Sequence, residues 1–464
     1  MNDKRQSNQQ LELAFQGRSE GESPGSSEER VESNMAKDEP DGPADTTKLM
    51  EEVTTQWNLG EAYKRVRSNG GAPGVDGITV HELPIHFRKN WPEIKAQLLG
   101  GTYKPKPVKR VEIPKPTGGT RKLGIPCAQD RLIQQAILQV LQRRWDQTFS
   151  EQSYGFRPGR SAHQAIEQAQ KYVAEGYEYV VDVDLEKFFD RVNHDMLMSR
   201  IAKRVEDKRL LRIIRAFLNA GIMENGLVGP PQDEGVPQGG PLSPLLSNLF
   251  LDDLDRELEQ RGHRFVRYAD DCNIYVRSER AGHRVMEGIK RYLKKKLKLK
   301  VNEKKSSVGK VNKRKFLGFS IEWSRIGVPL RCISPASLER FKDRIRRMTK
   351  RLSGRSIEQI IQALAPYLHG WRAYYGFCET SWTLRDLDGW IRRRLRAIIW
   401  TQWKTYRQRW KSLRKLGIAY EKAIDTAWKG CQSNSAWAMS KDSRVQRALS
   451  PKYFAELGLP SLVK

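Results

Sequence analysis

Residues 267–276 read RYADDCNIYV, and this stretch sets two adjacent aspartates, Asp270 and Asp271, between two runs of strand-forming residues. The first run is FVRY at 265–268 and the second is NIYV at 273–276. Both consist mainly of aromatic and β-branched residues, which favour strands. We therefore predict a β-hairpin with Asp and Cys in a tight turn and both aspartates near its tip. Adjacent carboxylates repel one another unless a cation lies between them, whereas a solvated turn also tolerates aspartate.

A second acidic segment reads YVVDVDLEKFFDRVNHDML at 179–197. Its first residues alternate as in a strand, with Asp182 and Asp184 on one face and valines on the other. A charged residue on a strand built for burial is costly unless it is paired or binds a metal. If this strand neighbours the hairpin, Asp184, Asp270 and Asp271 converge at one end of a sheet. Carboxylates suit Mg²⁺, so we predict a catalytic site of two Mg²⁺ ions, with Mn²⁺ as a substitute, able to activate a 3′-hydroxyl and stabilise pyrophosphate.

The overall composition indicates a polyanionic partner. The 464-residue chain has 83 Lys and Arg against 55 Asp and Glu and a pI near 9.9. Nucleic acid is the first candidate, and an anionic membrane surface is the competitor. No apolar run approaches the length of a membrane span and no signal-peptide core is present, so we expect a soluble, cytoplasmic protein without a membrane partner. The five scattered cysteines and seven histidines show no ligand spacing, and we expect no zinc.

Changes in composition divide the chain into four segments. Residues 1–47 hold five Lys or Arg against eleven Asp or Glu, which predicts a disordered acidic tail. Helical and strand patterns alternate over 48–325, as in an α/β domain. Residues 326–430 are predicted to be α-helical, because apolar residues recur there at three- and four-residue steps. Residues 431–464 are predicted to form a basic tail and are a candidate DNA contact.

The predicted helical segment mixes aromatic and basic residues. Eight of the twelve Trp lie between Trp371 and Trp437, interleaved with Arg. Arg stems that cover a small helical core explain part of this pattern. Aromatic and Arg side chains also stack on the unpaired bases of RNA, and we expect both. The string RRRLR makes Arg392, Arg393 and Arg394 candidate RNA-binding residues.

The two acidic segments together, YADD and DVDLEKFFD, resemble the paired palm motifs of reverse transcriptases. Further segments occur in the order of that family: VEIPKPTGGTRKLGIP (111–126), SYGFRPGRSAHQAI (153–166), GVPQGGPLSPLLSNLFLDDLD (235–255), KVNEKKS (300–306) and KFLGF (315–319). GGAPGVDGITV (70–80) resembles the amino-terminal extension of group II intron enzymes, and HGWRAYYGFCE (369–379) resembles part of their thumb and maturase domain. Over about 48–430, the chain therefore resembles the group II intron-encoded reverse transcriptases and maturases.

This resemblance implies an α/β right-hand polymerase, with fingers and palm, followed by an α-helical thumb and maturase domain. It implies that Lys115 and Arg121 clamp the triphosphate of an incoming nucleotide. It also implies a nucleotide-binding role for Gln238, whose glycine-flanked loop lets backbone approach the nucleotide closely. Phe189, five residues after Asp184, takes the family's position beneath the sugar, where an aromatic ring excludes a 2′-hydroxyl.

The implied function is that of an RNA-directed DNA polymerase that also acts as a maturase. Its partners would be intron RNA as template and splicing substrate, a DNA primer or target, and deoxynucleoside triphosphates. One alternative is a splicing cofactor with a non-polymerising scaffold, against which the three carboxylates argue. Another is a reverse transcriptase of a retron or diversity-generating element, which the segment at 70–80 disfavours. We expect no nuclease domain rich in His and Cys, because only two Cys, Cys378 and Cys431, and no His follow His369.

Overall fold

The computed structural model describes residues 46–114, 120–224, 227–229, 234–236, 239–350, 354–433 and 435–463. Contacts within the chain divide it into two compact units. The first unit comprises Met1–Ser161, Val181–Ile274 and His283–Ser307, and the second comprises Ala162–Val180, Tyr275–Gly282 and Val308–Lys464. The predicted acidic tail at 1–47 lies outside the described residues, apart from its last two.

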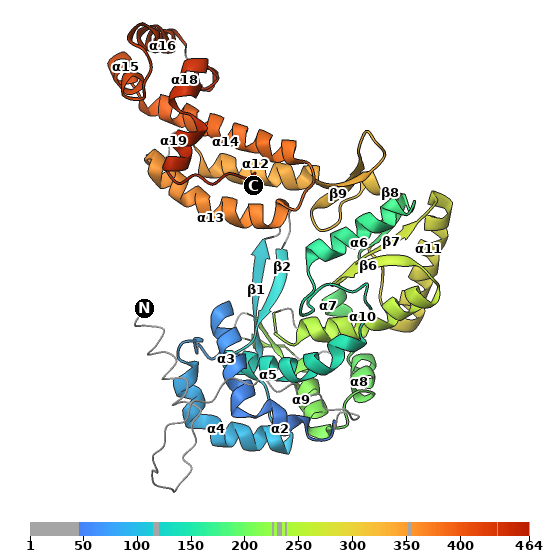
Figure 1. The fold of residues 1–464 in the computed structure, drawn as a ribbon. Coiled ribbons are helices and arrows are strands. Elements are labelled where there is room, and N and C mark those ends of the chain that lie inside the picture. Colours follow the sequence, from blue (N-terminus) through green and yellow to red (C-terminus); the bar gives the residue numbers. More distant parts are fainter. Residues whose placement is uncertain are drawn as a thin grey trace, which may run out of the picture. The chain divides into compact units, whose positions relative to one another are not determined.

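The first unit contains a layer of helices that pack on one another (Figure 1). Its helical elements are α2 (Leu49–Val53), α3 (Gln56–Asn69), α4 (Leu83–Gly100), α5 (Ala128–Trp145), η1 (Asp146–Thr148), α7 (Phe188–Arg191), α8 (His194–Ala202), α9 (Lys208–Leu218), α10 (Ser243–Gln260) and η2 (Leu293–Leu297). Helix α5 is central, and its polar residues are buried with partners. The Gln139 amide, for example, donates to the Asn58 side-chain oxygen of α3 at 2.8 Å, which satisfies both groups away from water.

Two four-stranded sheets carry the rest of the α/β region. One has the order β2-β1-β4-β5 and contains β1 (Val108–Pro114), β2 (Thr120–Ile125), β4 (Ile222–Glu224) and β5 (Leu227–Val228). Strands β1 and β2 form an antiparallel hairpin, whereas β4 runs parallel to β1. The other has the order β6-β7-β3-β8 and contains β3 (Tyr179–Val183), β6 (Arg264–Tyr268), β7 (Asp271–Val276) and β8 (Ser307–Lys310). Because β3 lies next to β7, the predicted adjacency of the two acidic segments is confirmed.

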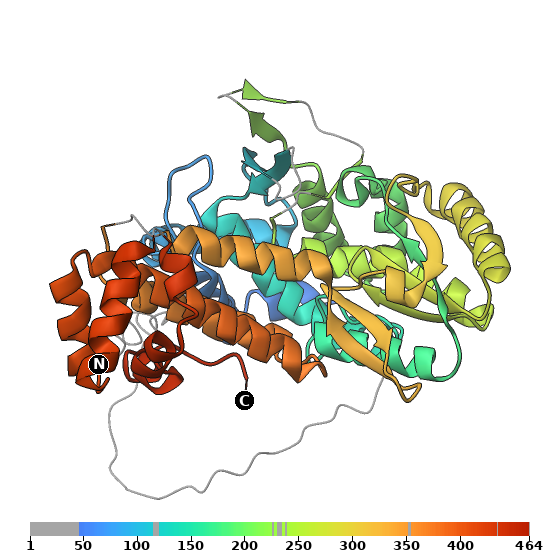
Figure 2. The same cartoon turned by 90° about the horizontal axis from the view of Figure 1, so that it is seen from above.

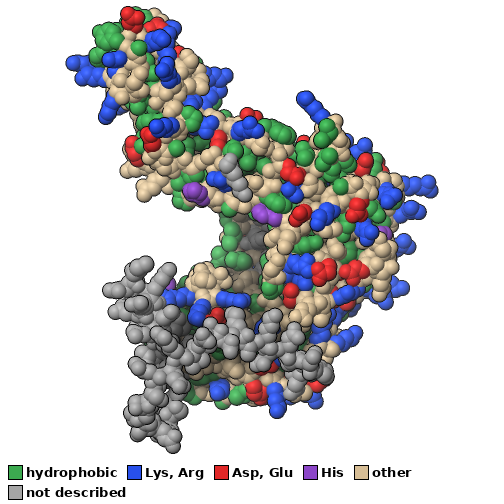
Figure 3. All heavy atoms as spheres, viewed as in Figure 1, with side chains coloured by type: hydrophobic (Ala, Val, Ile, Leu, Met, Phe, Trp, Pro, Cys, Tyr) green, Lys and Arg blue, Asp and Glu red, His purple; other side chains and the backbone are tan. Residues whose placement is uncertain are grey.

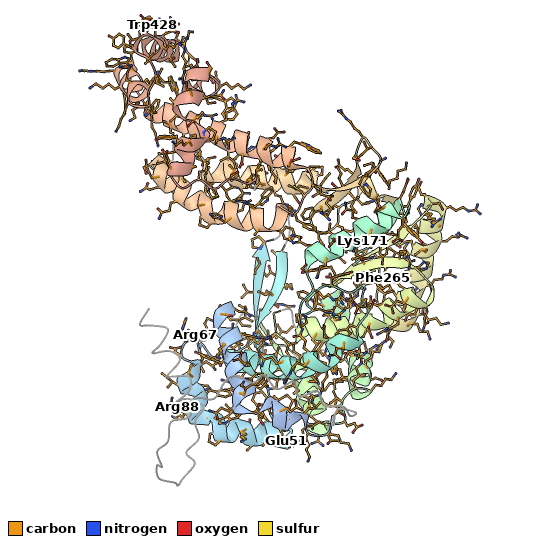
Figure 4. All side chains as sticks on the ribbon, viewed as in Figure 1. Glu51, Arg67, Arg88, Lys171, Phe265 and Trp428 are labelled. Atoms are coloured by element: carbon orange, nitrogen blue, oxygen red, sulfur yellow. The ribbon has the colours of Figure 1, made fainter. Side chains whose placement is uncertain are left out.

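Alternation explains which faces of these strands are covered. In β3, Val181 and Val183 are buried and Asp182 between them is half-exposed, as the period of two requires. Phe265 on β6, labelled in Figure 4, is fully buried. Helix α11 (Glu279–Tyr292) follows β7 directly in the chain. The sheet therefore exposes its carboxylates at one strand end while its apolar residues are covered.

The second unit is mainly helical, and α12, α13 and α14 lie side by side in Figures 1 and 2. Its elements include α6 (Ala162–Ala174), η3 (Val311–Lys313), β9 (Phe319–Trp323), β10 (Pro329–Ile333), α12 (Pro335–Met348), α13 (Ile357–Tyr375), α14 (Ser381–Gln402), α15 (Tyr406–Lys415) and α16 (Tyr420–Gln432). Strands β9 and β10 form a two-stranded antiparallel sheet. The helices predicted from apolar periodicity are confirmed. Their buried residues, among them Phe341, Leu364 and Trp400, form one hydrophobic core.

The last part of the chain contributes to this core. It contains α17 (Ala436–Met439), α18 (Ser443–Ala448) and α19 (Pro451–Glu456). Val445, Leu449 and Phe454 are fully buried against the helices that precede them. The segment expected as a basic tail is thus folded in the described residues, and a DNA contact from it would use only its exposed side chains. Among the helices of the described residues, none is both long enough and apolar enough to cross a bilayer.

Candidate active site

The two adjacent aspartates lie where the chain turns from β6 into β7. Asp270 follows Ala269 in the turn, and Asp271 is the first residue of β7. The predicted hairpin is confirmed, but its turn consists of Ala269 and Asp270 rather than Asp and Cys, because Cys272 is buried within the strand. Ala269 has a φ of 58°, a left-handed conformation that a residue with a Cβ keeps only when its surroundings compensate the strain.

Asp184 follows β3 directly, and the segment at 300–306 holds it in place. The Asp184 amide donates to Ser306 Oγ at 2.8 Å, and its carbonyl accepts from the Asn302 amide at 2.8 Å. Lys305 Nζ lies 3.3 Å from Asp184 Oδ2, with side-chain exposures of 67% and 26%. Solvent screens such an ion pair, so it is weak and replaceable. The sequence assigns no role to Lys305 or Ser306, because only the folded sheet brings them to Asp184.

The carboxylates of this site act on one another. Asp271 keeps exposed surface, yet the protein atoms crowded around its carboxyl group, and then the charges of Asp270, Asp182 and Asp184, raise its pKa to about 6. The positive charge of Lys305 acts in the opposite direction. Three further carboxylates and one exposed lysine therefore act electrostatically on Asp271. Such a cluster favours the binding of a further cation.

The donor type of this cluster fits a hard divalent cation. Mg²⁺ takes oxygen ligands, and it commonly uses one or two carboxylates and completes its shell with water and substrate phosphates. Among the described residues, however, no three His, Cys, Asp or Glu side chains come close enough together to hold a metal ion. Asp184, Asp270 and Asp271 therefore fit a divalent cation in their donor atoms and charge. To bind one ion together, their carboxyl groups would have to move closer to one another.

Phe189 lines a cavity in the first unit together with residues of β1 and β2. The lining includes Arg110, Lys122 and Val236. Phe189 belongs to α7, where the preceding Phe188 is buried and Phe189 itself is half-buried. The Phe189 carbonyl accepts a hydrogen bond from the Val236 amide at 2.6 Å, which fixes the backbone that carries the ring. A fixed, half-buried ring beside two cations can contact an anionic ligand that has an apolar or sugar face.

The other predicted nucleotide-binding residues are less defined. Lys115 and Gln238 lie outside the described residues, and for Arg121 the backbone is described, in β2 opposite Ile113, but not the side chain. Arg110 and Lys122 supply cations to the same hairpin, and our sequence reasoning missed them. In the observed register Arg110 faces Gly124, and Glu112 faces Lys122. Residues two apart on a strand share a face, so strand alternation could have placed both cations together.

The three arginines of α14 differ in their surroundings. Arg393 lies over the Trp437 ring at 3.7 Å and donates to the Trp437 carbonyl at 3.3 Å. Arg394 donates to Thr349 Oγ1 at 2.7 Å. The side chain of Arg392 makes no hydrogen bond or ion pair with another described residue. Arg393 and Arg394 thus contribute to packing, whereas the Arg392 side chain is engaged by no described residue and is the best placed of the three to bind a phosphate. Many other Lys and Arg side chains cover the face seen in Figure 3.

Comparison with known families matches two parts of the chain. Residues 113–321 match the family described as reverse transcriptase (RNA-dependent DNA polymerase). Residues 338–417 match the maturase-specific domain of group II introns. The first match includes Asp184, Asp270 and Asp271, and the second covers α12 to α15.

Two individual proteins and one solved structure also match parts of the chain. Protein YkfC of Escherichia coli K12 is 33% identical over 305 residues, which are 57% of this chain and 80% of YkfC. Group II intron-encoded protein LtrA of Lactococcus lactis subsp. cremoris is 35% identical over 207 residues, which are 44% of this chain but only 34% of LtrA. Among solved structures, a partial Cas6-RT-Cas1–Cas2 complex has 25% identity and a TM-score of 0.35, and the match covers 53% of this chain and 42% of that one.

Proposed function

Since this chain belongs to the family of group II intron-encoded reverse transcriptases and maturases, we propose that it copies RNA into DNA and also binds and helps to splice its intron RNA. The observation that carries the proposal is the carboxylate cluster at the ends of β3 and β6–β7. A chain that served only as an RNA-binding scaffold would gain nothing from holding Asp184, Asp270 and Asp271 within range of mutual repulsion.

Asp184, Asp270 and Asp271 would hold divalent cations, Mg²⁺ or in its place Mn²⁺. Members of the reverse transcriptase family use divalent metals, which when bound activate the 3′-hydroxyl of a primer and stabilise the departing pyrophosphate. In the absence of such a cation, Lys305 supplies part of the neutralising charge. The same carboxylates would thus accept a cation in place of a weak internal ion pair.

The cavity beside Phe189 would receive the deoxynucleoside triphosphate. Arg110 and Lys122 line it and would attract the phosphates, together with Lys115, Arg121 and Gln238 as the resemblance implies. Phe189 would lie beneath the sugar and reject a 2′-hydroxyl by contact. Because the ring is half-buried and its backbone is anchored to Val236, it would resist displacement by a ribonucleotide.

Splicing assistance would depend on a different part of the chain. The match at 338–417 to a maturase-specific domain supports a role in binding intron RNA and disfavours the retron or diversity-generating alternative. The excess of 83 Lys and Arg over 55 Asp and Glu would supply phosphate contacts, and exposed aromatics such as Trp382 and Trp428 could stack on bases. The partners are then intron RNA, a DNA primer or target, and deoxynucleoside triphosphates.

The test is the double substitution Asp270→Ala with Asp271→Ala in the full chain. It removes one carboxylate from the turn and one from the first residue of β7 and leaves the apolar packing in place, so folding should survive. DNA synthesis on an RNA template should be lost, and splicing of the intron RNA at low Mg²⁺ should largely remain. The control is Asp195→Ala, since that side chain is 81% exposed and pairs only with Arg215 among the described residues. Retained DNA synthesis would exclude the carboxylates as the metal site, and loss of both activities in a folded variant would mean that they share one site.

A further inference from the structure

The turn that carries the aspartates rests on a buried cation. Arg267, three residues before Asp270, has no exposed side-chain surface, and neither has its partner Asp255 on α10. The contact is a bidentate ion pair, in which Arg267 Nε lies 2.7 Å from Asp255 Oδ1 and Nη2 lies 2.5 Å from Oδ2. Although burial opposes the charge on the guanidinium, Asp255 raises the pKa of Arg267. A buried pair of this kind is stable only if the remaining donors are also satisfied.

The remaining nitrogen of Arg267 reaches the turn itself. Nη1 donates to the Ala269 carbonyl at 2.8 Å and to Asn248 Oδ1 at 3.0 Å. Ala269 is the residue with φ of 58°, a conformation that costs about 1–2 kcal/mol for a residue with a Cβ. A donor fixed by a buried ion pair holds the Ala269 carbonyl in the direction that this conformation requires. The guanidinium thus connects α10 to the residue immediately before Asp270.

The segment at 152–155 also packs against the turn. This segment runs along β6, because the Arg267 amide donates to the Gln152 carbonyl and the Tyr154 amide donates to the Arg267 carbonyl, both at 2.9 Å. Asn248, besides accepting from Arg267, donates to the Gly155 carbonyl at 2.8 Å. A Cβ on Gly155 would lie 2.3 Å from the Ala269 amide nitrogen. This distance is a steric clash, so the backbone would have to shift. The turn is therefore both packed against the backbone of Gly155 and bonded to a buried guanidinium.

We propose that Arg267 is a positioning residue, which together with Gly155 holds the Ala269–Asp270 turn so that Asp270 and Asp271 can share a divalent cation with Asp184. The inference rests on the proposed function, because it assigns those carboxylates to cations. Arg267 and Gly155 are buried, so their effect on a bound cation would pass through the turn. Replacing a residue that only stabilised the fold would lower the melting temperature without changing the affinity for metal.

The experiment measures Mn²⁺ binding to the full chain by electron paramagnetic resonance, beside the melting temperature and primer extension. The first variant is Gly155→Ala, which pushes on the Ala269 backbone and leaves every charge in place. Its matched control is Gly74→Ala, where a Cβ would meet the backbone of Cys127 at 2.6 Å, in the same unit but away from the turn. Gly155→Ala should raise the Mn²⁺ concentration for half-saturation by about tenfold (~1.4 kcal/mol), whereas Gly74→Ala should change it by less than about twofold at a similar loss of melting temperature.

A second variant covers the case in which Gly155→Ala does not fold. Arg267→Met combined with Asp255→Leu replaces the ion pair by apolar groups of similar size, a change that proteins commonly tolerate. It also removes the donor to the Ala269 carbonyl. The folded double variant should show the same weakened Mn²⁺ binding and a lower kcat with little change in the KM for deoxynucleotides.

The outcomes separate this inference from the proposed function. Unchanged Mn²⁺ half-saturation in the folded Arg267→Met, Asp255→Leu variant would overturn the positioning role. If the unaltered protein binds Mn²⁺, loses affinity in both variants and yet makes no DNA, the positioning role stands and the proposed polymerase activity fails. If the unaltered protein binds no Mn²⁺, both are overturned.

Discussion

Replacing Asp271 by Asn should stabilise the metal-free protein while abolishing DNA synthesis. The reason lies in the charges around this carboxyl group. Crowding by the protein and the charges of Asp270, Asp182 and Asp184 raise its pKa from 3.8 to about 6. Above pH 6 the folded chain therefore holds a carboxylate that its surroundings disfavour, and Asn has the shape of the protonated acid without the charge.

The sign and size of the effect follow from linkage. The folded state binds the Asp271 proton more tightly than the unfolded state, so the contribution of this group to stability is fully present below about pH 4 and is lost as the pH rises through about 6. A shift of this size corresponds to an upper limit of about 3 kcal/mol. Because Asp271 is exposed, solvent screens most of the repulsion, and we expect about 1 kcal/mol.

The assay is thermal unfolding of both proteins in chelator at pH 4 and pH 8. At pH 8 the Asp271→Asn protein should melt about 2 °C higher, and at pH 4 the two should agree. Added Mg²⁺ should raise the melting temperature of the unaltered protein more than that of the variant. Asp195→Asn is the matched control, because it removes one carboxylate from an exposed side chain outside the cluster. A variant that melts lower than the unaltered protein at pH 8 in chelator would refute the reasoning, because Asp271 would then be a net stabilising partner.

Three further predictions test other parts of the molecule. Phe189→Val should admit ribonucleotides while keeping much of the deoxynucleotide activity. An unchanged ratio of ribonucleotide to deoxynucleotide incorporation would mean that the ring serves only core packing. Arg392→Ala should reduce the slope of log affinity for RNA against log salt by about 0.7–0.9 per lost phosphate contact with no change in melting temperature, whereas Arg393→Ala should lower the melting temperature by removing the contact to Trp437. Leu364→Ala should destabilise the helical unit by about 3 kcal/mol in denaturant unfolding, because Leu364 is fully buried, and Leu338→Ala, only partly buried, should cost less.

The strand and helix pattern could largely be predicted from the sequence. The alternation of YVVDVDL specifies β3, and the spacing of Phe341 and Ile345 specifies α12, because each period identifies one covered face. The position of the hairpin turn could not be predicted, since Cys is small enough for a turn and only its burial shows that it belongs to β7. The fold of 435–463 was also missed, because that segment acquires its apolar partners from helices far earlier in the chain.

The acidic residues of the site could be singled out, but their surroundings could not. Asp255 sits in an acidic run, LDDLDRELE, that is indistinguishable in sequence from a solvated helix face. Its burial and its bidentate contact with Arg267 arise only when α10 packs against β6. Lys305 likewise lies in a lysine-rich stretch in which any residue could have faced Asp184. Long-range neighbours of this kind are set by tertiary packing, on which local periodicity carries no information.

Lys305, which contacts Asp184, and Arg267, which contacts the turn, differ in how firmly they are held, and this difference suits the proposed chemistry. Arg267 is buried and forms a bidentate ion pair with Asp255. Removing one partner of such a pair lowers the free energy of unfolding by about 3–5 kcal/mol, so a metal ion would not displace Arg267. Lys305 is exposed beside Asp184, and a solvent-screened pair contributes only about 0–1 kcal/mol. A divalent cation would therefore displace Lys305 at little cost while the turn keeps its shape. If the positions of the two cations were exchanged, the carboxylates would be closed to metal and the turn would be loosely held.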